Sequence, residues 1–523
     1  MDYIPNLDGD LKKMLADIEA GSYEDLISAV PRSLRGAKIS LPAPLTEMEL
    51  QREIGKLAKE NTSLEDTISF LGAGAYEHFI PSAVDAIASR GEFATAYTPY
   101  QAEASQGTLQ VIYEYQSMIC ALTGMDVSNA SLYDGSSAVA EAALLARGIQ
   151  KGRNKILVAS TMHPDYRRNL KTYLAGMGVE VAELTARDGV VDLDALRSTA
   201  DGGACALIVQ TPNFYGQVEP MEEVEKIAKA AGALFVASAN PISLGLLKPP
   251  GEYGADFAVG EAQPLGIPVG YGGPWLGYLA CKAPLVHKIS GRIVGRTLDE
   301  EGTPGFCLTL QAREQHIRRE KATSNICTNQ SLMALRACLY LSLVGKEGIQ
   351  EVAKLNYARA HALAKALCGC PGFSLRHPGV FFNEFVVATP VPAAELCREA
   401  LEHGVIAGLP LSSVEPERTH DLLVCATETK SPAQLERYIE VVRDVTRGAQ
   451  KPAAAKKTVN PKLLPRALWW FRWGAMITFL SGLFLFTIIY MYTPGAGFGP
   501  SNLFSNPDGG ISGRAWWILM GML

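Results

Sequence analysis

The sequence has no C-x-x-C pair, and its first residues do not have the composition of a secretory signal peptide, so a zinc site of that kind is excluded and a secreted protein is not expected. Its ten cysteines are scattered over 523 residues, and the closest pair, Cys368 and Cys370, lacks the spacing of zinc ligands. The N-terminus, MDYIPNLDGDLKK, is acidic and polar, so we expect no signal peptide. These features predict a reduced, cytoplasmic protein with free thiols and no metal site.

Basic residues are too few in most of the chain for a nucleic-acid partner. Residues 451–523 carry seven Lys or Arg and one Asp, which leaves 41 basic and 53 acidic residues in 1–450, a net charge of −12. Contacts with nucleic-acid phosphates need clustered Lys and Arg. The composition, 48% apolar and 20% charged, instead indicates a globular protein of two or three domains.

The order of the expected elements predicts the domain organisation. Residues 1–70 are predicted to form a helical arm, because Leu11, Met14 and Ile18 recur at helical spacing, as do Leu50 and Ile54. Helices then alternate with short apolar runs over 71–345, which predicts a large α/β domain with a mainly parallel, mixed sheet covered on both faces. The predicted strands are Ile156–Ala159, Ala206–Val209, Leu234–Ala237, Phe257–Val259 and Leu276–Cys281, and the predicted helices include Leu109–Leu122, Val139–Ile149 and Glu222–Ala231.

A smaller α/β domain is predicted over 346–449. Its expected strands are Phe381–Val387 and Leu422–Cys425, flanked by the helices Ile349–Leu367 and Pro432–Val445. Residues 450–465 are rich in Ala, Pro and Lys and are interpreted as a linker.

The tail, residues 466–523, is predicted to be hydrophobic and membrane-like. Trp473–Tyr492 is an uncharged run of twenty residues, about the length that crosses a bilayer, with aromatic residues at its ends. Basic residues precede it, so the N-terminal part would stay in the cytoplasm, tethered to the inner membrane. A buried hairpin helix is the alternative. The string LPRALWWFRWGAMITFLSGLFLF resembles membrane domains of urate-oxidising proteins.

Several long strings in the remaining sequence carry a family resemblance. They are the opening MDYIPN, YTPYQAEASQGTLQ (97–110), TPNFYG (211–216), GEAQPLGIPVGYGGP (260–274) and REQHIRREKATSNICTNQ (313–330). In this order they resemble subunit 1 of the glycine cleavage system P-protein, glycine dehydrogenase (decarboxylating), over about residues 1–447.

The resemblance implies a fold and a reaction. The fold is the aminotransferase-like fold type I of pyridoxal-phosphate-dependent transferases, with a seven-stranded large domain and a small C-terminal domain. The expected partners are a homologous subunit 2, in a heterotetramer of two subunits each, and a lipoylated H-protein. Glycine would lose CO2, and its aminomethyl group would pass to the lipoyl arm of the H-protein.

Two parts of a working cofactor site are missing from this sequence. Pyridoxal phosphate needs a lysine for its Schiff base and an acid beside its pyridine nitrogen. No lysine lies between Phe257–Val259 and Leu276–Cys281, since Lys248 comes too early and Lys282 too late. The strand Leu234–Ala237 ends in Ala237, Ser238 and Asn240, without a carboxylate. We therefore expect that the partner subunit holds pyridoxal phosphate and that none is covalently bound here.

Candidate site residues fall into two groups. Tyr97, Thr98, Tyr100 and Gln101 are predicted to reach the partner's cofactor or the carrier's arm, or alternatively to pack the subunit interface. Non-covalent contacts with an anionic group are predicted for Ser136 and Ser137, which follow Asp134 at a helix start, and for Asn213, His316, Arg318 and Lys321. Ordinary helix capping and structural ion pairs are the alternatives. We expect a structural role for His163, at a sheet edge, and tight turns at Gly260, Gly266, Gly270, Gly272 and Gly273.

Three functions remain open from the sequence. The first is an enzyme subunit that is active only with its partner. The second is a non-catalytic, degenerate homologue that docks the H-protein or the partner subunit. The third is a membrane-tethered scaffold, suggested by Trp473–Tyr492.

Overall fold

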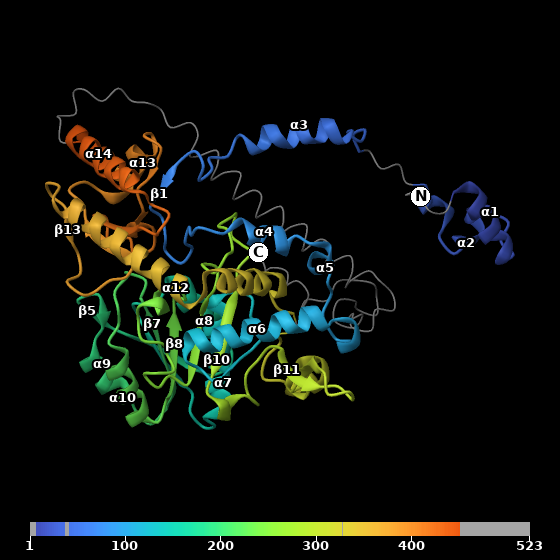
Figure 1. Ribbon diagram of the computed structural model, residues 1–523, viewed down its shortest axis with the longest axis horizontal. Coiled ribbons are helices and arrows are strands. Elements are labelled where there is room, and N and C mark those ends of the chain that lie inside the picture. Colours follow the sequence, from blue (N-terminus) through green and yellow to red (C-terminus); the bar gives the residue numbers. More distant parts are fainter. Residues whose placement is uncertain (1–6, 37–40, 327, 450–523) are drawn as a thin grey trace, which may run out of the picture. The chain divides into compact units, whose positions relative to one another are not determined.

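The computed structural model describes residues 7–36, 41–326 and 328–449 (Figure 1). Residues 1–446 form one compact unit, and nearly all of the second unit, 447–523, lies outside the described residues. The predicted membrane span Trp473–Tyr492 is among those undescribed residues. Across the described ranges, every helix is too short or too polar to cross a membrane.

A seven-stranded sheet is the centre of the large domain. Its order is β2 (Val127–Ser128), β10 (Gly277–Cys281), β9 (Phe257–Glu261), β8 (Leu234–Ala239), β7 (Ala204–Thr211), β3 (Lys155–Ala159) and β4 (Glu180–Leu184). The strands from β9 to β4 are parallel, whereas β10 is antiparallel to both β9 and β2. The prediction of a mainly parallel, mixed sheet is confirmed, and all five predicted strands belong to it.

Helices cover both faces of this sheet because its strands are apolar on both sides. In β3, Ile156 and Val158 pack with α7 (Gly135–Ile149) and α8 (Pro164–Leu174) on one face. The alternate residues Leu157 and Ala159 pack into the core of the other face. The helices on that face are α6 (Gln106–Thr123), α9 (Leu193–Thr199), α10 (Met221–Ala231) and the first half of α12 (Ser331–Cys368).

The small domain has its own sheet and core. The sheet order is β13 (Ser374–Leu375), β14 (Glu384–Ala388), β17 (Asp421–Cys425) and β16 (Leu409–Pro410), with the helices α13 (Ala393–Leu401) and α14 (Pro432–Ala449) packed against it. Helix α12 runs from the large-domain core into this one and kinks at Gly345, whose φ is +60° (Figure 1). The boundary expected near residue 346 would lie next to this kink, and it stays a prediction, because residues 1–446 form a single unit.

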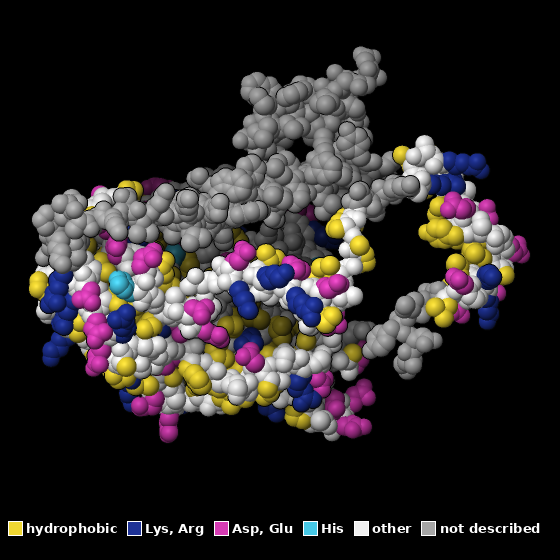
Figure 2. Space-filling view, turned by 90° about the horizontal axis from the view of Figure 1, so that it is seen from above, with side chains coloured by type: hydrophobic (Ala, Val, Ile, Leu, Met, Phe, Trp, Pro, Cys, Tyr) yellow, Lys and Arg dark blue, Asp and Glu magenta, His cyan; other side chains and the backbone are white. Residues whose placement is uncertain are grey.

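The N-terminal arm forms helices that bury nothing. They are α1 (Asp8–Asp17), α2 (Tyr23–Leu26) and α3 (Glu47–Ala58), and none of their residues is buried within the described chain. Thr46 starts α3 as a capping box with Glu49, as the sequence pattern T-x-x-E favours. Figure 2 shows apolar side chains gathered on this arm. The arm ends in β1 (Ile68–Ser69), which pairs with β15 (Val405–Ile406) of the small domain.

An extended segment, residues 72–79, follows β1 and is held by side chains from much later in the chain. The Tyr76 hydroxyl donates to Glu384 Oε2 over 2.6 Å. His78 Nδ1 lies 2.8 Å from Glu428 Oε2, and Lys430 Nζ lies 2.5 Å from a carboxylate oxygen of Glu77. The segment then leads through α4 (Ser82–Ala88) and α5 (Gly91–Ala94) to α6.

Some elements were not among the predictions. Strand β4 is an edge strand in which Glu180 and Glu183 interrupt the apolar residues, so it has no continuous apolar run for the sequence to reveal. It also places β3 inside the sheet, so the prediction of a sheet edge at His163 is wrong. Others are the hairpin β11 (Ile293–Leu298) and β12 (Pro304–Thr309), the short pair β5 (Ala186–Arg187) and β6 (Val190–Val191), and α11 (Gln315–Arg318).

Candidate functional site

The first place to look for a site is the edge where the parallel strands end, because ligands of open α/β sheets bind there. The N-terminus of α7 lies at this edge, next to the end of β9. The Asp134 side chain caps the helix by accepting from the backbone N–H of Ser137 over 2.6 Å and from the Ser136 hydroxyl over 2.8 Å. The capping alternative for these two serines is thus what the structure shows.

A carboxylate from the protein itself occupies the position beside this helix start. Glu261, the last residue of β9, accepts from the backbone N–H of Gly135 over 2.9 Å. Its other oxygen accepts from the N–H groups of Gln263 (2.9 Å) and Leu276 (2.8 Å). Although Glu261 retains some solvent exposure, protein surrounds its carboxyl group, and this desolvation raises its pKa to about 7.

The neighbouring strand ends offer neither a lysine nor an acid to a cofactor. Lys248 Nζ lies 2.8 Å from Glu222 at the surface, and Lys282 Nζ lies 2.7 Å from Asp256, which precedes β9 and so lies at the other end of that strand. At the end of β8, Asn240 accepts from the backbone N–H of Ile242 over 2.9 Å.

Close packing fills the space between these strand ends. The Tyr278 hydroxyl donates to the carbonyl of Ala239 over 2.8 Å. A Cβ at Gly260 would lie 2.4 Å from that carbonyl oxygen and 2.7 Å from the Tyr278 ring, so glycine is required there. The residues at this edge do not fit pyridoxal phosphate, because the lysine and the acid that it needs are absent and Glu261 already accepts the Gly135 N–H at the helix start.

Two further predicted residues, Asn213 and His163, form hydrogen bonds within the fold. Asn213 is buried, and its amide donates to Gly189 O (2.8 Å) and Glu219 Oε1 (2.7 Å) while accepting from two backbone N–H groups. Its predicted role in binding an anion is wrong, because all of its hydrogen-bonding capacity is used inside the fold. His163 caps α8 and lies 2.9 Å from Ala73 O; desolvation lowers its pKa, so the structural role expected for it is supported.

A second cluster of polar residues contains members of two strings quoted above, 97–110 and 313–330. Arg292 connects them. Arg292 Nη2 donates to the Tyr100 hydroxyl over 3.3 Å, and its guanidinium lies 5.4 Å from the centre of that ring. Arg292 Nη1 donates to Asn329 Oδ1 over 3.1 Å, and Asn329 Nδ2 donates to the Ser131 hydroxyl over 3.0 Å. The His316 ring meets Tyr100 edge-on, with centres 6.1 Å apart.

Arg292 is the most informative member of this cluster. It is 4% exposed, its Nε has no hydrogen-bond partner, and no carboxylate of the described chain lies within ion-pair distance of it. A buried, uncompensated cation is costly, and an opposite charge at the surface above it would relieve that cost. Tyr100, which is 48% exposed, connects it to the surface.

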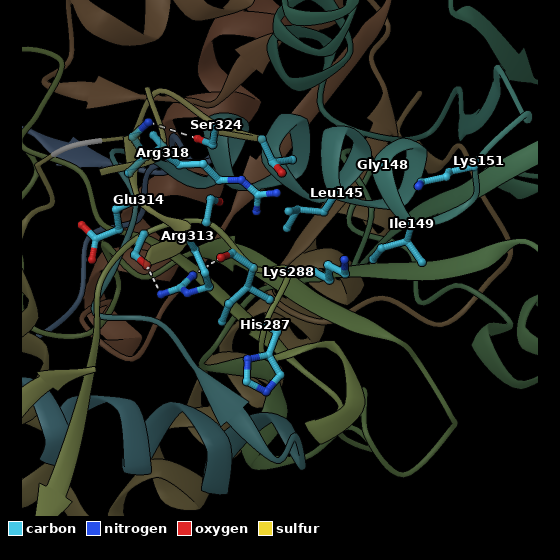
Figure 3. Close-up of a pocket in the computed structure, with 15 residues that line it drawn as sticks. Leu145, Gly148, Ile149, Lys151, His287, Lys288, Arg313, Glu314, Arg318 and Ser324 are labelled. Carbon is cyan, nitrogen blue, oxygen red and sulfur yellow. Dashed lines mark hydrogen bonds between the residues drawn. The ribbon is translucent and has the colours of Figure 1, made fainter. Parts of the chain in front are cut away.

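The structure places the other predicted residues around this cluster or apart from it. Tyr97 is 85% exposed, Thr98 is half-buried, and Gln101 is exposed at the start of a 3-10 turn before α6. His316 faces Tyr100, whereas Arg318 lines a separate cavity (Figure 3), and Lys321 is exposed. The three basic residues predicted to bind one anion are therefore not brought to one point.

Glu261 and Arg292 were missed by the sequence reasoning. A single glutamate at a strand end and a single arginine before a strand carry no local signal, because their partners lie 126 and 192 positions away. The absence of lysine from residues 260–275 was the one usable sign that the strand edge had changed its role.

Comparison with known proteins agrees with the resemblance. Residues 1–442 match the family described as glycine cleavage system P-protein. A probable glycine dehydrogenase (decarboxylating) subunit 1 of Desulfitobacterium hafniense is 49% identical over 440 residues, which are 84% of this chain and 98% of that relative. A crystal structure of glycine decarboxylase (P-protein) of the glycine cleavage system, in inhibitor-bound form, has a TM-score of 0.79 at 43% identity and covers 85% of this chain and 100% of that one.

More distant likenesses concern the fold and the tail. A sphingosine-1-phosphate lyase of Burkholderia pseudomallei has a TM-score of 0.59 at 16% identity, covering 86% of this chain and 98% of its own, which is a likeness of fold alone. The expected α/β fold, that of fold type I pyridoxal-phosphate-dependent proteins, is confirmed. Residues 452–498 match a separate family, described as urate oxidase N-terminal, in agreement with the resemblance of the tail.

Proposed function

The chain belongs to the glycine cleavage system P-protein family, and from this premise we propose that it is subunit 1 of a two-subunit glycine dehydrogenase (decarboxylating). Together with subunit 2 it would decarboxylate glycine and transfer the aminomethyl group to the lipoyl arm of the H-protein. The observation that carries the proposal is the collinear match over residues 1–442, with 98% of the relative from Desulfitobacterium hafniense covered.

In this proposal the partner subunit holds pyridoxal phosphate, which supplies the electron sink for loss of CO2. Support comes from the edge where this chain's own parallel strands end. Glu261 already accepts the Gly135 N–H there, Lys248 and Lys282 are paired elsewhere, and Asn240 stands where an acid would be needed. In this proposal the chain is the subunit that lacks the cofactor-binding lysine, and it is active only in the complex.

The contribution of this chain is the surface around Tyr100. The loop Tyr97–Gln101 is exposed at its tip and is anchored from below by the bond between Arg292 and the Tyr100 hydroxyl. A rigidly anchored polar loop can position groups for a neighbouring site. The positive charge of Arg292 favours an anionic group of glycine or of the partner's cofactor, and the covering surface keeps water away from the reacting atoms.

The N-terminal arm supports a tightly held partner. Helix α3 exposes Leu50, Ile54 and Leu57 on one face, each about half accessible, with no packing partner in the described chain. Exposed apolar faces of this kind commonly mark protein–protein contacts. We propose that subunit 2 covers this face in a heterotetramer with two copies of each subunit.

The proposed location is the cytoplasm, with a tether to the inner membrane through the tail. The tether rests on the uncharged run Trp473–Tyr492 and on the separate family match of residues 452–498. Fractionation of the full chain beside a variant that ends at Gln450 tests it. The tether is refuted if both proteins stay in the soluble fraction.

The deciding experiment is glycine-dependent CO2 exchange in the presence of H-protein, with the full chain alone, with subunit 2 alone and with both. We expect exchange from the mixture and none from either protein alone. Exchange by this chain alone would refute the partner-held cofactor. No gain over subunit 2 alone would favour the alternative function, a non-catalytic homologue that docks the H-protein or the partner.

A further inference from the structure

A cavity of about 230 Å³ is lined in part by Ile289, Ser290 and Gly291, the three residues that precede Arg292. Its walls are the C-terminal half of α7, the loop around 287–291 and the segment 313–326 (Figure 3). Leu145, Ile149 and Ile326 line one part of it, and the remainder is polar. It is separate from the edge where the parallel strands end, since neither Glu261 nor Tyr278 lines it.

Positive charge dominates the lining of this cavity. Five basic residues contribute to it: Lys151, His287, Lys288, Arg313 and Arg318. None of them forms an ion pair with a carboxylate of the described chain, although most lysines and arginines elsewhere on the surface do. Figure 3 shows Arg318, Lys288 and Lys151 around the same space, each from a different segment.

Two acidic residues lie near the cavity, and Glu314 acts electrostatically on Arg313 without forming an ion pair with it. Glu314 lines it, but Glu314 Oε2 lies 3.6 Å from His316 Nδ1, outside the set of five. Glu141, on α7, lies fully buried near Ser290 and Ser324. Desolvation raises the pKa of Glu141, and the two hydroxyl groups lower it by less, so its neutral form is favoured relative to a free glutamate.

Hydrogen bonds within the protein fix part of the cavity wall. Arg313 is held in place by donating to the carbonyl groups of Leu310 (3.0 Å), Gly291 (2.9 Å) and Ile289. Desolvation lowers the pKa of Arg313, and the nearby Glu314 carboxylate and Cys281 thiol offset only part of that effect. The Ser290 hydroxyl, in a residue only 7% exposed, has no hydrogen-bond partner of ordinary geometry in the described chain.

These properties define the ligand. Several Lys and Arg side chains that form no ion pair in the described chain suit a compact dianion with several acceptor oxygens, and a phosphate monoester has that character. The volume equals that of about eight waters at roughly 30 Å³ each, more than a phosphate group alone requires. We propose that this cavity binds the phosphate monoester of a small organic molecule, with the organic part against Leu145 and Ile149.

The test is calorimetric titration of the full chain with inorganic phosphate and with phenyl phosphate, at an ionic strength fixed by NaCl. We expect one saturable site, with phenyl phosphate bound severalfold more tightly than phosphate because its ring meets the apolar wall. The double variant Lys288→Gln/Arg318→Gln should lose at least tenfold in affinity. Ser290→Ala, which keeps every charge, should lose a few-fold.

A matched double variant, Lys229→Gln/Arg52→Gln, removes two exposed basic residues outside the cavity and should bind as the wild type does. Melting curves establish that each variant is folded. The proposal would be overturned if no saturable binding is observed, or if both double variants lose the same affinity. If phenyl phosphate binds no more tightly than phosphate, the part of the proposal that concerns the organic group is wrong. The titration needs no subunit 2, so its failure is distinguishable from failure of the proposed function.

Discussion

The carboxylate of Glu261 accepts the backbone N–H of Gly135 over 2.9 Å, at the start of a helix where an anion would otherwise bind. The same side chain also accepts from two other backbone N–H groups, of Gln263 and Leu276. One residue of β9 thereby fixes α7, the loop after β9 and the start of β10 together. An edge that holds a ligand in other proteins of this fold is here a structural junction.

Glu261→Ala should destabilise the protein and leave it responsive to small anions. The variant loses the acceptor of three N–H groups, which should lower the free energy of unfolding by about 1–3 kcal/mol. Acetate, formate or phosphate should restore part of the loss in a saturable way, measured by urea unfolding. Glu222→Ala, at an exposed position, is the control and should show neither effect. If the variant loses stability but does not respond to anions, the three N–H groups that Glu261 accepts from do not form an anion-binding position.

Glu384 should make stability depend on pH. Burial raises its pKa to about 7, from the ordinary value near 4.5, even though the Tyr76 hydroxyl and the Ala73 N–H donate to it. The folded state therefore holds this proton more tightly than the unfolded state does. Its contribution to stability is full below about pH 4.5 and is lost as the pH rises through 7, by an amount on the order of 3 kcal/mol.

The measurement is urea unfolding between pH 5 and 8, comparing wild type with Glu384→Gln. The glutamine imitates the protonated acid, so the difference in stability between the two proteins should shrink or reverse as pH rises. The titratable neighbours Tyr76 and Cys425 stay protonated over this range, because desolvation raises the pKa of each. Parallel curves for the two proteins would show that Glu384 does not titrate in this range.

Tyr100→Phe should lower the activity of the complex without dissociating it. The change removes the hydroxyl that Arg292 donates to, and one such hydrogen bond is worth about a tenfold change in rate. Glycine-dependent CO2 exchange reports the rate, and gel filtration reports assembly with subunit 2. The control is Tyr357→Phe, on the exposed side of α12. Unchanged exchange would leave Tyr100 as a packing residue of the interface.

Replacing Leu50, Ile54 and Leu57 together by serine should weaken binding of subunit 2. The three side chains are about half exposed, so the isolated chain should unfold at nearly the same urea concentration as the wild type. A matched triple variant on other exposed positions of α3, Gln51, Arg52 and Lys56 to serine, carries a similar cost in helix propensity. Equal affinity for subunit 2 in both triple variants would remove α3 from the interface.

Elements with a strong local pattern were predictable from the sequence. The runs Ile156–Ala159 and Ala206–Val209 are strands because they are apolar on both faces, and the alternating helices fix their parallel order. Strand β4 was not predictable, because Glu180 and Glu183 interrupt its apolar residues at the sheet edge. The kink of α12 at Gly345 was not predicted, since one glycine in a helical pattern does not by itself indicate a change of direction.

The candidate site was predictable in part. The sequence showed what was missing, namely a lysine in residues 260–275 and an acid after Leu234–Ala237. It could not show what replaces them, because the contact between Glu261 and Gly135 exists only after the sheet has formed. The same holds for Tyr100 and Arg292, whereas Asn213 was misread because a buried amide and a ligand amide look alike in a sequence.

The side-chain contacts that hold residues 72–79 have a consequence for folding during synthesis on the ribosome. Tyr76, His78 and Glu77 are held by Glu384, Glu428 and Lys430, partners that lie 308, 350 and 353 positions later in the chain. Domains usually fold from the N-terminus as they emerge during synthesis. Here the connection between the arm and the first large-domain helix cannot be locked until almost the entire family-matched region has been translated.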